Sequence, residues 1–331
     1  MKCATFKGRK DMFEAHNAAL DKVQKSLEEY LETKRASFPR FYFLSDDELL
    51  QILAQAKDPR AVQPHLRKCF DNLVKLTFSD QPKSIDILAM NSSEGETVGL
   101  GKNLKARGNV EDWMTLLEER MKTELTVCLK EGLLDYDTKV RSEWVNYHPG
   151  QVVATVAQMT WARGTEKVLR SKEPIDGMPG WLQWQIDELG ELVKRIRSNL
   201  TKLQRKIVVA LTTTDVHARD ILDEMVQKRV ASIDDFLWQQ QLRYYWEKHG
   251  ADDDCIIRHA DSIIGYGYEY MGATSRLVIT PMTDRCWLTL TASFGLKLGA
   301  APAGPAGTGK VSSTKQIQTM AISLLSALLL N

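Results

Sequence analysis

The chain has 331 residues, of which 43% are hydrophobic and 26% charged, an ordinary composition for a folded protein with room for two or three domains. Its 44 basic and 43 acidic residues leave a net charge of +1, which gives no electrostatic case for nucleic acid or an anionic membrane as the main partner. The five cysteines are scattered without metal-ligand spacing, so we expect free thiols in a reducing compartment.

The two ends of the sequence give no sign of export or membrane insertion. The first ten residues lack the apolar stretch of a secretion signal. The apolar run from Met320 to Leu330 is shorter than the roughly 20 residues that a membrane helix requires. We therefore expect a cytoplasmic protein.

Helical periodicity begins at residues 11 to 36, where apolar side chains recur at a spacing that places them in one stripe on a helix. The stripe consists of Phe13, Leu20, Val23, Leu27 and Tyr30. Phe38-Pro39 ends this helix. In the next one, the Ser45 hydroxyl and the Glu48 carboxylate are each placed to cap a free backbone N–H.

The second helix has a buried face made of Leu49, Leu50, Ile52 and Leu53, and Asp58-Pro59 closes it. A third helix is expected to start at Gln63-Pro64, because proline is tolerated in the first turn of a helix. Residues 84 to 100 then break the helical pattern and predict a β-hairpin. Helices are predicted again over about 110 to 131 and 151 to 163.

The strictest periodicity alternates steps of four and three residues and predicts one long helix. Its positions are Leu182, Ile186, Leu189, Val193, Ile196, Leu200 and Leu203. Another helix is predicted from about 215 to 229, and residues 232 to 235 are predicted to cap a helix that runs to Lys248.

The character of the sequence changes after Asp252. Short β-prone runs at residues 255 to 257, 266 to 270 and 277 to 279 are separated by glycines, and a helix from about 284 to 298 leads into a glycine-rich loop. We place a domain boundary near residue 250. The predicted fold is mainly α: an elongated helical body with a small β-hairpin, followed by an incomplete α/β start of a nucleotide-binding module.

The glycine-rich loop matches the G-x-x-x-x-G-K part of a phosphate-binding loop. It consists of Gly304, Pro305, Ala306, Gly307, Thr308, Gly309 and Lys310. In such a loop backbone N–H groups surround the phosphates and the lysine meets the β and γ phosphates. ATP or ADP is therefore the expected ligand.

The loop departs from the motif at its last position. A serine or threonine hydroxyl normally binds Mg²⁺ there, but this chain has Val311. Ser312 lies about 100° further round the helix that should follow, so its hydroxyl is expected to point away from the metal. The case for Mg²⁺ is weakened, and no other metal site is predicted. An accidental glycine-rich turn and an ancestral but inactive loop remain alternatives.

Other chemically suggestive residues are better explained by packing. His148, His217 and His259 lie outside any cluster with metal-ligand spacing. Asp215 and His217 do not form an acid–base pair, because residues two apart on a helix do not face each other. The aromatic cluster of Trp238, Tyr244, Tyr245 and Trp246 is expected to pack in the core rather than to form a ligand platform.

The chain resembles axonemal dynein heavy chains over about residues 11 to 310. The resembling runs are LEEYLETKR at 27–35, FPRF at 38–41, VQPHLRKCF at 62–70, QMTW at 158–161, DVHARD at 215–220, QLRYYW at 241–246, YGYEY at 266–270 and VITPMTDR at 278–285. So many long runs in the same order do not arise by chance.

The resemblance implies four segments. Residues 1–10 have no family counterpart, 11–250 are the carboxyl-terminal part of the linker, the lever that moves across the AAA+ ring, and 251–310 begin the first AAA+ module. Residues 311–331 form a divergent tail. By analogy, Ile279, Thr280 and Pro281 lie against the adenine and residues 304–310 hold the phosphates.

The same resemblance implies the function. We expect a fragment or short isoform of an ATP-dependent, minus-end-directed microtubule motor of the ciliary axoneme, with microtubules and dynein intermediate and light chains as family partners. The chain alone is expected to bind nucleotide weakly at most and not to hydrolyse it, and no catalytic residue is assigned. Two alternatives remain: a non-enzymatic helical scaffold for other dynein components, and a small independent nucleotide-binding protein.

Overall fold

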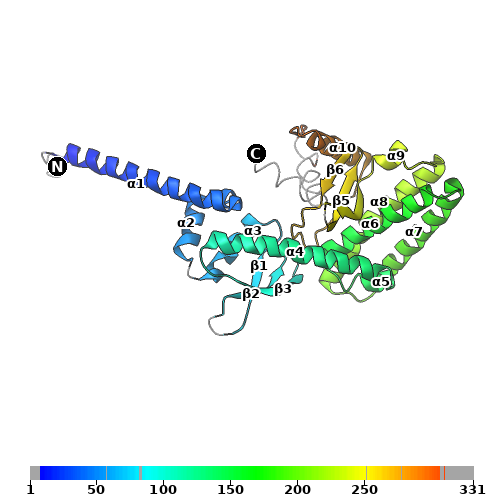
Figure 1. The fold of residues 1–331 in the computed structure, drawn as a ribbon, viewed down its shortest axis with the longest axis horizontal. Coiled ribbons are helices and arrows are strands. Elements are labelled where there is room, and N and C mark those ends of the chain that lie inside the picture. The colour runs from blue at the N-terminus through cyan, green and yellow to red at the C-terminus, as the bar shows by residue number, and fades with distance from the viewer. Residues whose placement is uncertain are drawn as a thin grey trace.

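The computed structural model describes residues 8–56, 58–81, 84–250, 252–276, 278–305 and 309. Over these residues the chain is mainly helical with small antiparallel sheets, which confirms the expected fold class. Figure 1 shows an elongated molecule in which one long helix extends from a body built around two sheets. Within the described ranges no helix is long and apolar enough to cross a membrane.

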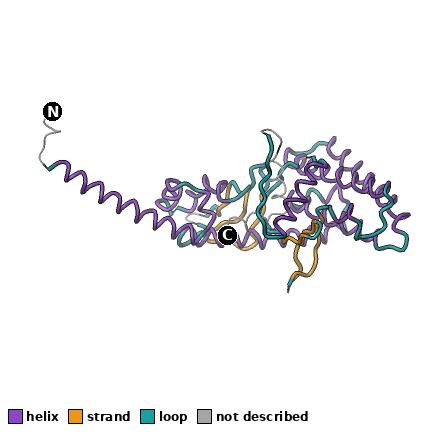
Figure 2. The backbone as a smooth tube through the Cα atoms, turned by 90° about the horizontal axis from the view of Figure 1, so that it is seen from above, coloured by secondary structure: helices purple, strands orange, loops and turns teal. Residues whose placement is uncertain are grey.

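The long extending helix is α1 (Arg9–Ser37), which confirms the first predicted helix. It projects away from the rest of the molecule for most of its length (Figures 1 and 2). Its apolar stripe is exposed: the exposed fraction is 54% for Phe13 and 64% for Leu20. Leu31, near the carboxyl end, is buried. Only the last turns of α1 therefore pack against the body.

Four short elements follow α1 and cover the first sheet. They are η1 (Pro39–Phe43), α2 (Asp46–Ala54), η2 (Pro59–Val62) and α3 (Gln63–Cys69). The predicted cap of α2 is confirmed, because the Ser45 hydroxyl accepts a hydrogen bond from the Glu48 N–H and the Glu48 carboxylate accepts one from the Ser45 N–H. Leu49 and Ile52 are buried, as the sequence predicts.

The first sheet has the strand order β1–β2–β3 and is antiparallel. Its strands are β1 (Lys75–Phe78), β2 (Asp86–Asn91) and β3 (Thr97–Lys105). The predicted hairpin is confirmed, with Asn91 opposite Thr97 and with Gly95 at a φ of 86° in the turn. Strand β1 was not predicted, because its four residues are too few to stand out in the sequence.

Three helices then connect the first sheet to the rest of the body. They are α4 (Val110–Tyr136), α5 (Arg141–Trp144) and α6 (Gly150–Leu169). The predicted helices at 110–131 and 151–163 are confirmed and extend further toward their carboxyl ends. Helix α4 packs on both β3 and α6, so it links the two halves of the molecule (Figure 1).

The single long helix predicted over residues 182 to 203 is wrong. The chain forms α7 (Pro174–Arg197) and α8 (Lys202–Gln227), which pack on each other. The break is fixed locally: the Thr201 hydroxyl accepts a hydrogen bond from the Gln204 N–H, and the Arg205 side chain donates to the Ile196 carbonyl at 2.6 Å. The apolar period continues across the break because both helices keep an apolar side toward the core. The helix predicted at 215–229 is the second half of α8.

The helix predicted to run to Lys248 is also wrong. Asp235 does cap a helix, but α9 covers only Phe236–Gln239. The chain then forms a second antiparallel sheet in the order β4–β5–β6, with strands β4 (Arg243–His249), β5 (Asp252–His259) and β6 (Ser262–Gly265). The aromatic run Tyr244 to Trp246 favours a strand, and it pairs with residues 255 to 257. Residue 250, near which a domain boundary is predicted, lies in the turn between β4 and β5.

The last described helix is α10 (Pro281–Gly295), close to the predicted helix at 284–298. It packs on β6 and β5 through buried Trp287 and Leu290. The predicted β-prone run at 266–270 is not a strand, and neither are the described residues of the run at 277–279. Two apolar cores result. One spans both sheets and α4, and the other lies among α6, α7, α8 and α9 around Trp161 and Trp238.

Candidate nucleotide-binding region

The residues expected beside an adenine form the entry to α10. Thr280 is the residue before the helix, and its hydroxyl accepts a hydrogen bond from the Thr283 N–H at 3.3 Å. The Thr283 hydroxyl accepts one from the Thr280 N–H at 2.7 Å. Pro281 occupies the first helical position, where a missing N–H costs nothing. Ile279 is half-buried against the main core, whereas Thr280 and Pro281 are exposed.

Only part of the glycine-rich loop is described. Gly304, Pro305 and Gly309 are exposed, and Gly309 has a φ of 74°, which favours glycine. Ala306, Gly307, Thr308, Lys310 and Val311 lie outside the described residues, as does the rest of the tail.

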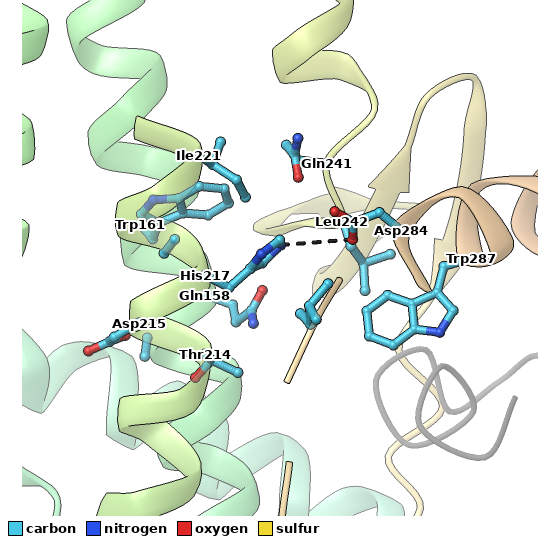
Figure 3. Close-up of a pocket in the computed structure, with 13 residues that line it drawn as sticks. Gln158, Trp161, Thr214, Asp215, His217, Ile221, Gln241, Leu242, Asp284 and Trp287 are labelled. Atoms are coloured by element: carbon cyan, nitrogen blue, oxygen red, sulfur yellow. Dashed lines mark ion pairs between the residues drawn. The ribbon is translucent and has the colours of Figure 1, made fainter. Parts of the chain in front are cut away.

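A pocket lies where α6 and α8 face the entry to α10 (Figure 3). Its walls are mainly apolar and include Trp161, Ile221, Leu242, Ile279 and Trp287. The space open to the centre of a water molecule is about 30 Å³, and the pocket is partly open to solvent. Of the residues predicted to bind nucleotide, the pocket contains Ile279 but none of the described loop residues.

His217 and Asp284 face each other across this pocket, with 3.9 Å between the His217 Nε2 and an Asp284 carboxylate oxygen (Figure 3). Burial lowers the pKa of His217 to about 4 and raises the pKa of Asp284 to about 6. Asp220 opposes the shift of His217 only weakly. Above pH 6 the pair is therefore a neutral imidazole beside a carboxylate. It is a polar contact between α8 and α10 and not a full ion pair.

Asp215, two residues before His217, points to the opposite side of α8 (Figure 3). Its carboxylate binds the buried guanidinium of Arg141 at 2.7 Å. This agrees with the expectation that Asp215 and His217 do not act together. The Arg141 partner was not predicted, because 74 residues separate the two side chains.

His259 and His148 are engaged in structural contacts. His259 is buried, with Nε2 2.9 Å from the Gln240 carbonyl and Nδ1 2.7 Å from the Thr291 hydroxyl. Burial lowers the pKa of His259 to about 4, so at neutral pH its Nε2–H donates to the carbonyl. His148 contacts Asp135 at 3.1 Å. The described part of the chain holds no group of three or more residues that could bind a metal.

The aromatic cluster packs as expected. Trp238 is fully buried in the core among α6 to α9, with its ring centroid 5.1 Å from that of Trp161. Tyr244 is buried in the main core, and Trp246 packs against that core from its edge. These rings leave no open aromatic platform for a ligand.

Comparison with known proteins gives two family matches. A family model described as "Dynein heavy chain, N-terminal region 2" matches residues 1–132. A second, described as "Hydrolytic ATP binding site of dynein motor region", matches residues 266–327. The first match includes residues 1–10 and the second extends past Lys310. The boundaries predicted at residues 10 and 310 stay predictions.

Curated relatives match almost the whole chain. It is 48% identical to human "Dynein axonemal heavy chain 6" over 336 aligned residues, which cover 96% of this chain and 8% of the human protein. It is 47% identical to mouse "Dynein axonemal heavy chain 1", over 91% of this chain and 7% of that protein. The "Dynein-1-beta heavy chain, flagellar inner arm I1 complex" of Chlamydomonas reinhardtii is 40% identical over 95% of this chain and 7% of its own length.

Proposed function

Because this chain belongs to the axonemal dynein heavy chain family, we propose that it forms part of the lever and the beginning of the ATP-binding module of a ciliary microtubule motor. Two observations support the proposal. The match to the N-terminal region 2 of dynein heavy chains precedes the match to the dynein hydrolytic ATP site, and relatives with 40% to 48% identity are axonemal heavy chains. The chain spans about 8% of the length of the human relative, so the motor activity belongs to a much longer protein.

The proposed location and partners follow from the same family. The chain is placed in the ciliary axoneme and its cytoskeleton, with microtubules as the track and dynein intermediate and light chains as partners of the complete assembly. The scaffold alternative is not favoured, because the similarity reaches the region matched as a hydrolytic ATP site. The third reading, a small independent nucleotide-binding protein, finds no relative among the matched proteins named above.

The proposed nucleotide site consists of Gly304 to Lys310 around the phosphates and Ile279 to Pro281 beside the adenine. The proposed role of Ile279 to Pro281 is supported by the defined backbone at the start of α10, where two reciprocal hydrogen bonds join Thr280 and Thr283. The loop holds phosphates through backbone N–H groups and the Lys310 ammonium. Val311 supplies no hydroxyl for a metal, so binding is proposed to be weak and nearly independent of Mg²⁺.

Isothermal titration calorimetry of the full chain with ATP, with and without Mg²⁺, tests this site. We expect weak binding that changes less than threefold when Mg²⁺ is removed and that disappears in Lys310→Ala. Val311→Thr should restore a Mg²⁺ dependence. No measurable heat in any of these conditions would refute nucleotide binding by the chain. Loss on Lys228→Ala, at an exposed lysine directly after α8, would show that the effect of Lys310 is not specific.

The chain alone is proposed not to hydrolyse ATP. Phosphoryl transfer depends on metal stabilisation of charge and on a positioned water, and Val311 removes one element of the metal site. Phosphate release by the purified chain should stay at the level of the Lys310→Ala variant. Turnover clearly above that level would overturn this part of the proposal and leave the family assignment intact.

A further inference from the structure

Residues 266–273, which we call the strap, run from the end of β6 into the middle of the body before the chain turns back to α10. The strap has no regular secondary structure, yet Tyr266, Tyr268 and the four residues 270–273 are buried. In Figure 1 it passes close to the middle of α4. An irregular buried segment cannot satisfy its own backbone groups, so the rest of the body must supply their partners.

On one side, the strap binds the half of the molecule that contains the first sheet. The Arg40 guanidinium donates two hydrogen bonds to the Glu269 carboxylate, at 2.9 and 2.6 Å. The Tyr270 hydroxyl donates to the buried carboxylate of Glu96 at 2.9 Å, and the Asn72 amide donates to the Met271 carbonyl at 2.7 Å. Arg40 belongs to η1, Glu96 lies in the turn directly before β3, and Asn72 lies in the loop before β1.

On the other side, the strap binds the start of α6. The Gln151 amide nitrogen donates to the Glu269 carbonyl and to the Tyr266 hydroxyl, both at 2.8 Å, and its oxygen accepts from the Met271 N–H at 2.8 Å. Glu96 joins the two sides, because its second oxygen accepts from the Gly150 N–H at 2.6 Å. That carboxylate thus caps α6, whose own preceding residue, Pro149, provides no side-chain cap.

Close backbone contact completes the fit. Gly272 has a φ of 59°, and a Cβ there would lie 2.7 Å from Ser92 and 2.8 Å from the Asn72 amide. At Gly150 a Cβ would lie 2.9 Å from Ala273. The strap is therefore pressed against the hairpin tip on one face and the start of α6 on the other, and glycines are needed at both contacts.

The bonds of the strap depend on one another. Without the strap, the Arg40, Glu96 and Gln151 side chains would lose partners in largely buried surroundings, and an unpaired buried polar group is costly. Breaking only some of these hydrogen bonds therefore leaves buried polar groups unpaired, at a cost in free energy similar to that of breaking them all. The strap is thus favoured to detach as a unit. Beyond Ala273 the contacts become fewer: among the described residues, Thr274, Ser275 and Val278 make no hydrogen bond, and Ser275 and Val278 are exposed. Arg276 is the exception, because its guanidinium is partly buried near Tyr244 and Tyr266.

We propose that the strap is a conformational latch that fixes the first-sheet half and the α6–α10 half in one arrangement and releases as a unit when the chain after Ala273 is displaced. The region matched as the dynein ATP site begins at residue 266, so its first eight residues are built into the helical body. The latch does not require nucleotide binding by this chain. If the proposed function holds, movement of the ATP-binding module would displace the chain after Ala273 and so act directly on the latch.

Hydrogen–deuterium exchange of the full chain, read by mass spectrometry without nucleotide, tests the latch. In Glu269→Gln we expect exchange at least tenfold faster in three places at once: the strap, the hairpin tip at residues 92–96 and the first turn of α6. Glu247→Gln is the matched control, because Glu247 pairs with Arg258 in a half-exposed ion pair of the second sheet. It should leave all three regions unchanged.

Faster exchange confined to residues next to Glu269, with the hairpin tip and α6 unchanged, would overturn the latch. Tyr270→Phe removes one hydroxyl and keeps the ring, so it provides the same test if Glu269→Gln does not fold. Circular dichroism should show unchanged helix content in Tyr270→Phe. Since every arm omits ATP, a failure here is distinct from a failure of the proposed nucleotide site.

Discussion

The Arg40 guanidinium and the Glu269 carboxylate form a two-point ion pair, although 229 positions separate them in the sequence. Arg40 also donates to Glu118 of α4 at 3.0 Å and to the Cys69 carbonyl, and its guanidinium stacks on the Phe70 ring at 4.7 Å. One side chain thus joins η1, α3, α4 and the strap. Burial lowers the pKa of Arg40, but the Glu269 and Glu118 carboxylates together outweigh it and raise the pKa above its ordinary value, so Arg40 stays charged.

A double-mutant cycle at this pair should reveal strong coupling. Arg40→Gln and Glu269→Gln should each lower the free energy of unfolding by about 3–5 kcal/mol, because each leaves a largely buried partner uncompensated. Arg40→Gln should cost more, since Glu118 also loses its bond to Arg40 and keeps only Lys122 as an ion-pair partner. The double variant should be more stable than the sum of the single effects predicts, by about 0.5–3 kcal/mol. Urea unfolding followed by circular dichroism measures all four proteins.

The control for this cycle is Arg163→Gln. Arg163 pairs with Asp137, and the two side chains are 55% and 57% exposed. Solvent screens such a pair, so little stability should be lost. Strict additivity of Arg40→Gln and Glu269→Gln would contradict direct coupling.

Gly164→Ala should destabilise the core among α6 to α9. A Cβ at residue 164 would lie 2.2 Å from the Trp181 ring, which is held by a hydrogen bond from its Nε1 to the Thr165 hydroxyl. Overpacking of this kind costs about 1–3 kcal/mol. Thermal unfolding checks the effect. Gly190→Ala in α7 is the control, because no atom lies within 4 Å of its Cβ position, and alanine there should be neutral or stabilising.

Thr201→Ala should weaken the start of α8 and the break after α7. The variant loses the hydroxyl that accepts from the Gln204 N–H, and such caps contribute about 1 kcal/mol. We expect a lower midpoint in urea and faster amide exchange over the first turn of α8. Thr213→Ala, at a partly exposed position inside the same helix, should change neither. If both variants behave alike, the Thr201 cap does not define the break.

The His217–Asp284 contact predicts opposite pH effects for its two members. The folded pKa of His217, about 4, lies below its unfolded value of about 6.5, so the unfolded chain binds more protons as pH falls through this window. Histidine at this position therefore destabilises the fold increasingly below pH 6.5. Relative to the parent chain, His217→Gln should gain stability as pH falls from 8 to 5.

Asp284 behaves in the reverse manner. Its folded pKa of about 6 lies above the unfolded value of about 3.9, so the folded chain keeps the proton longer and loses stability as pH rises through 6. Asp284→Asn should gain stability relative to the parent chain as pH rises from 5 to 8. Urea unfolding at both pH values, with Asp223→Asn at an exposed position of α8 as a control, distinguishes the two trends. Parallel changes in His217→Gln and Asp284→Asn would show that burial does not set these two pKa values.

Local chemistry explains which parts of the fold were predictable. The Ser45–Glu48 cap and the turn at Gly95 depend on residues three or four positions apart, and both appear as predicted. Helix α8 is different: its start at Thr201 is also a local signal, but the apolar period across residues 196 to 203 hides it. The run from Tyr244 to Trp246 favours a strand, but the capping residues at 232–235 predict a helix through it, and only the partner strand at 255–257 decides between the two.

The candidate site divides in the same way. The sequence predicted the loop at 304–310 from the spacing of its glycines and lysine, and the family resemblance predicted the segment at 279–281; both assignments stay predictions. It gave no sign of Arg40, Glu96 or Gln151, since each acquires its role from a partner that is at least 54 positions away. The exposure of the α1 stripe was equally hidden, because a period shows which residues share a face and not what covers that face.

The sequence by itself determined the family, the helical body and the position of the phosphate-binding motif, because these depend on residue order and short spacings. The tertiary structure alone decided that the chain forms a second sheet, that α7 and α8 are separate, and that the first residues of the matched ATP-site region are held inside the helical body. The physical reason is that a largely buried polar group such as the Glu269 carboxylate is stable only beside its partner. That partner, Arg40, lies 229 positions away in the sequence and is brought to it only by the fold.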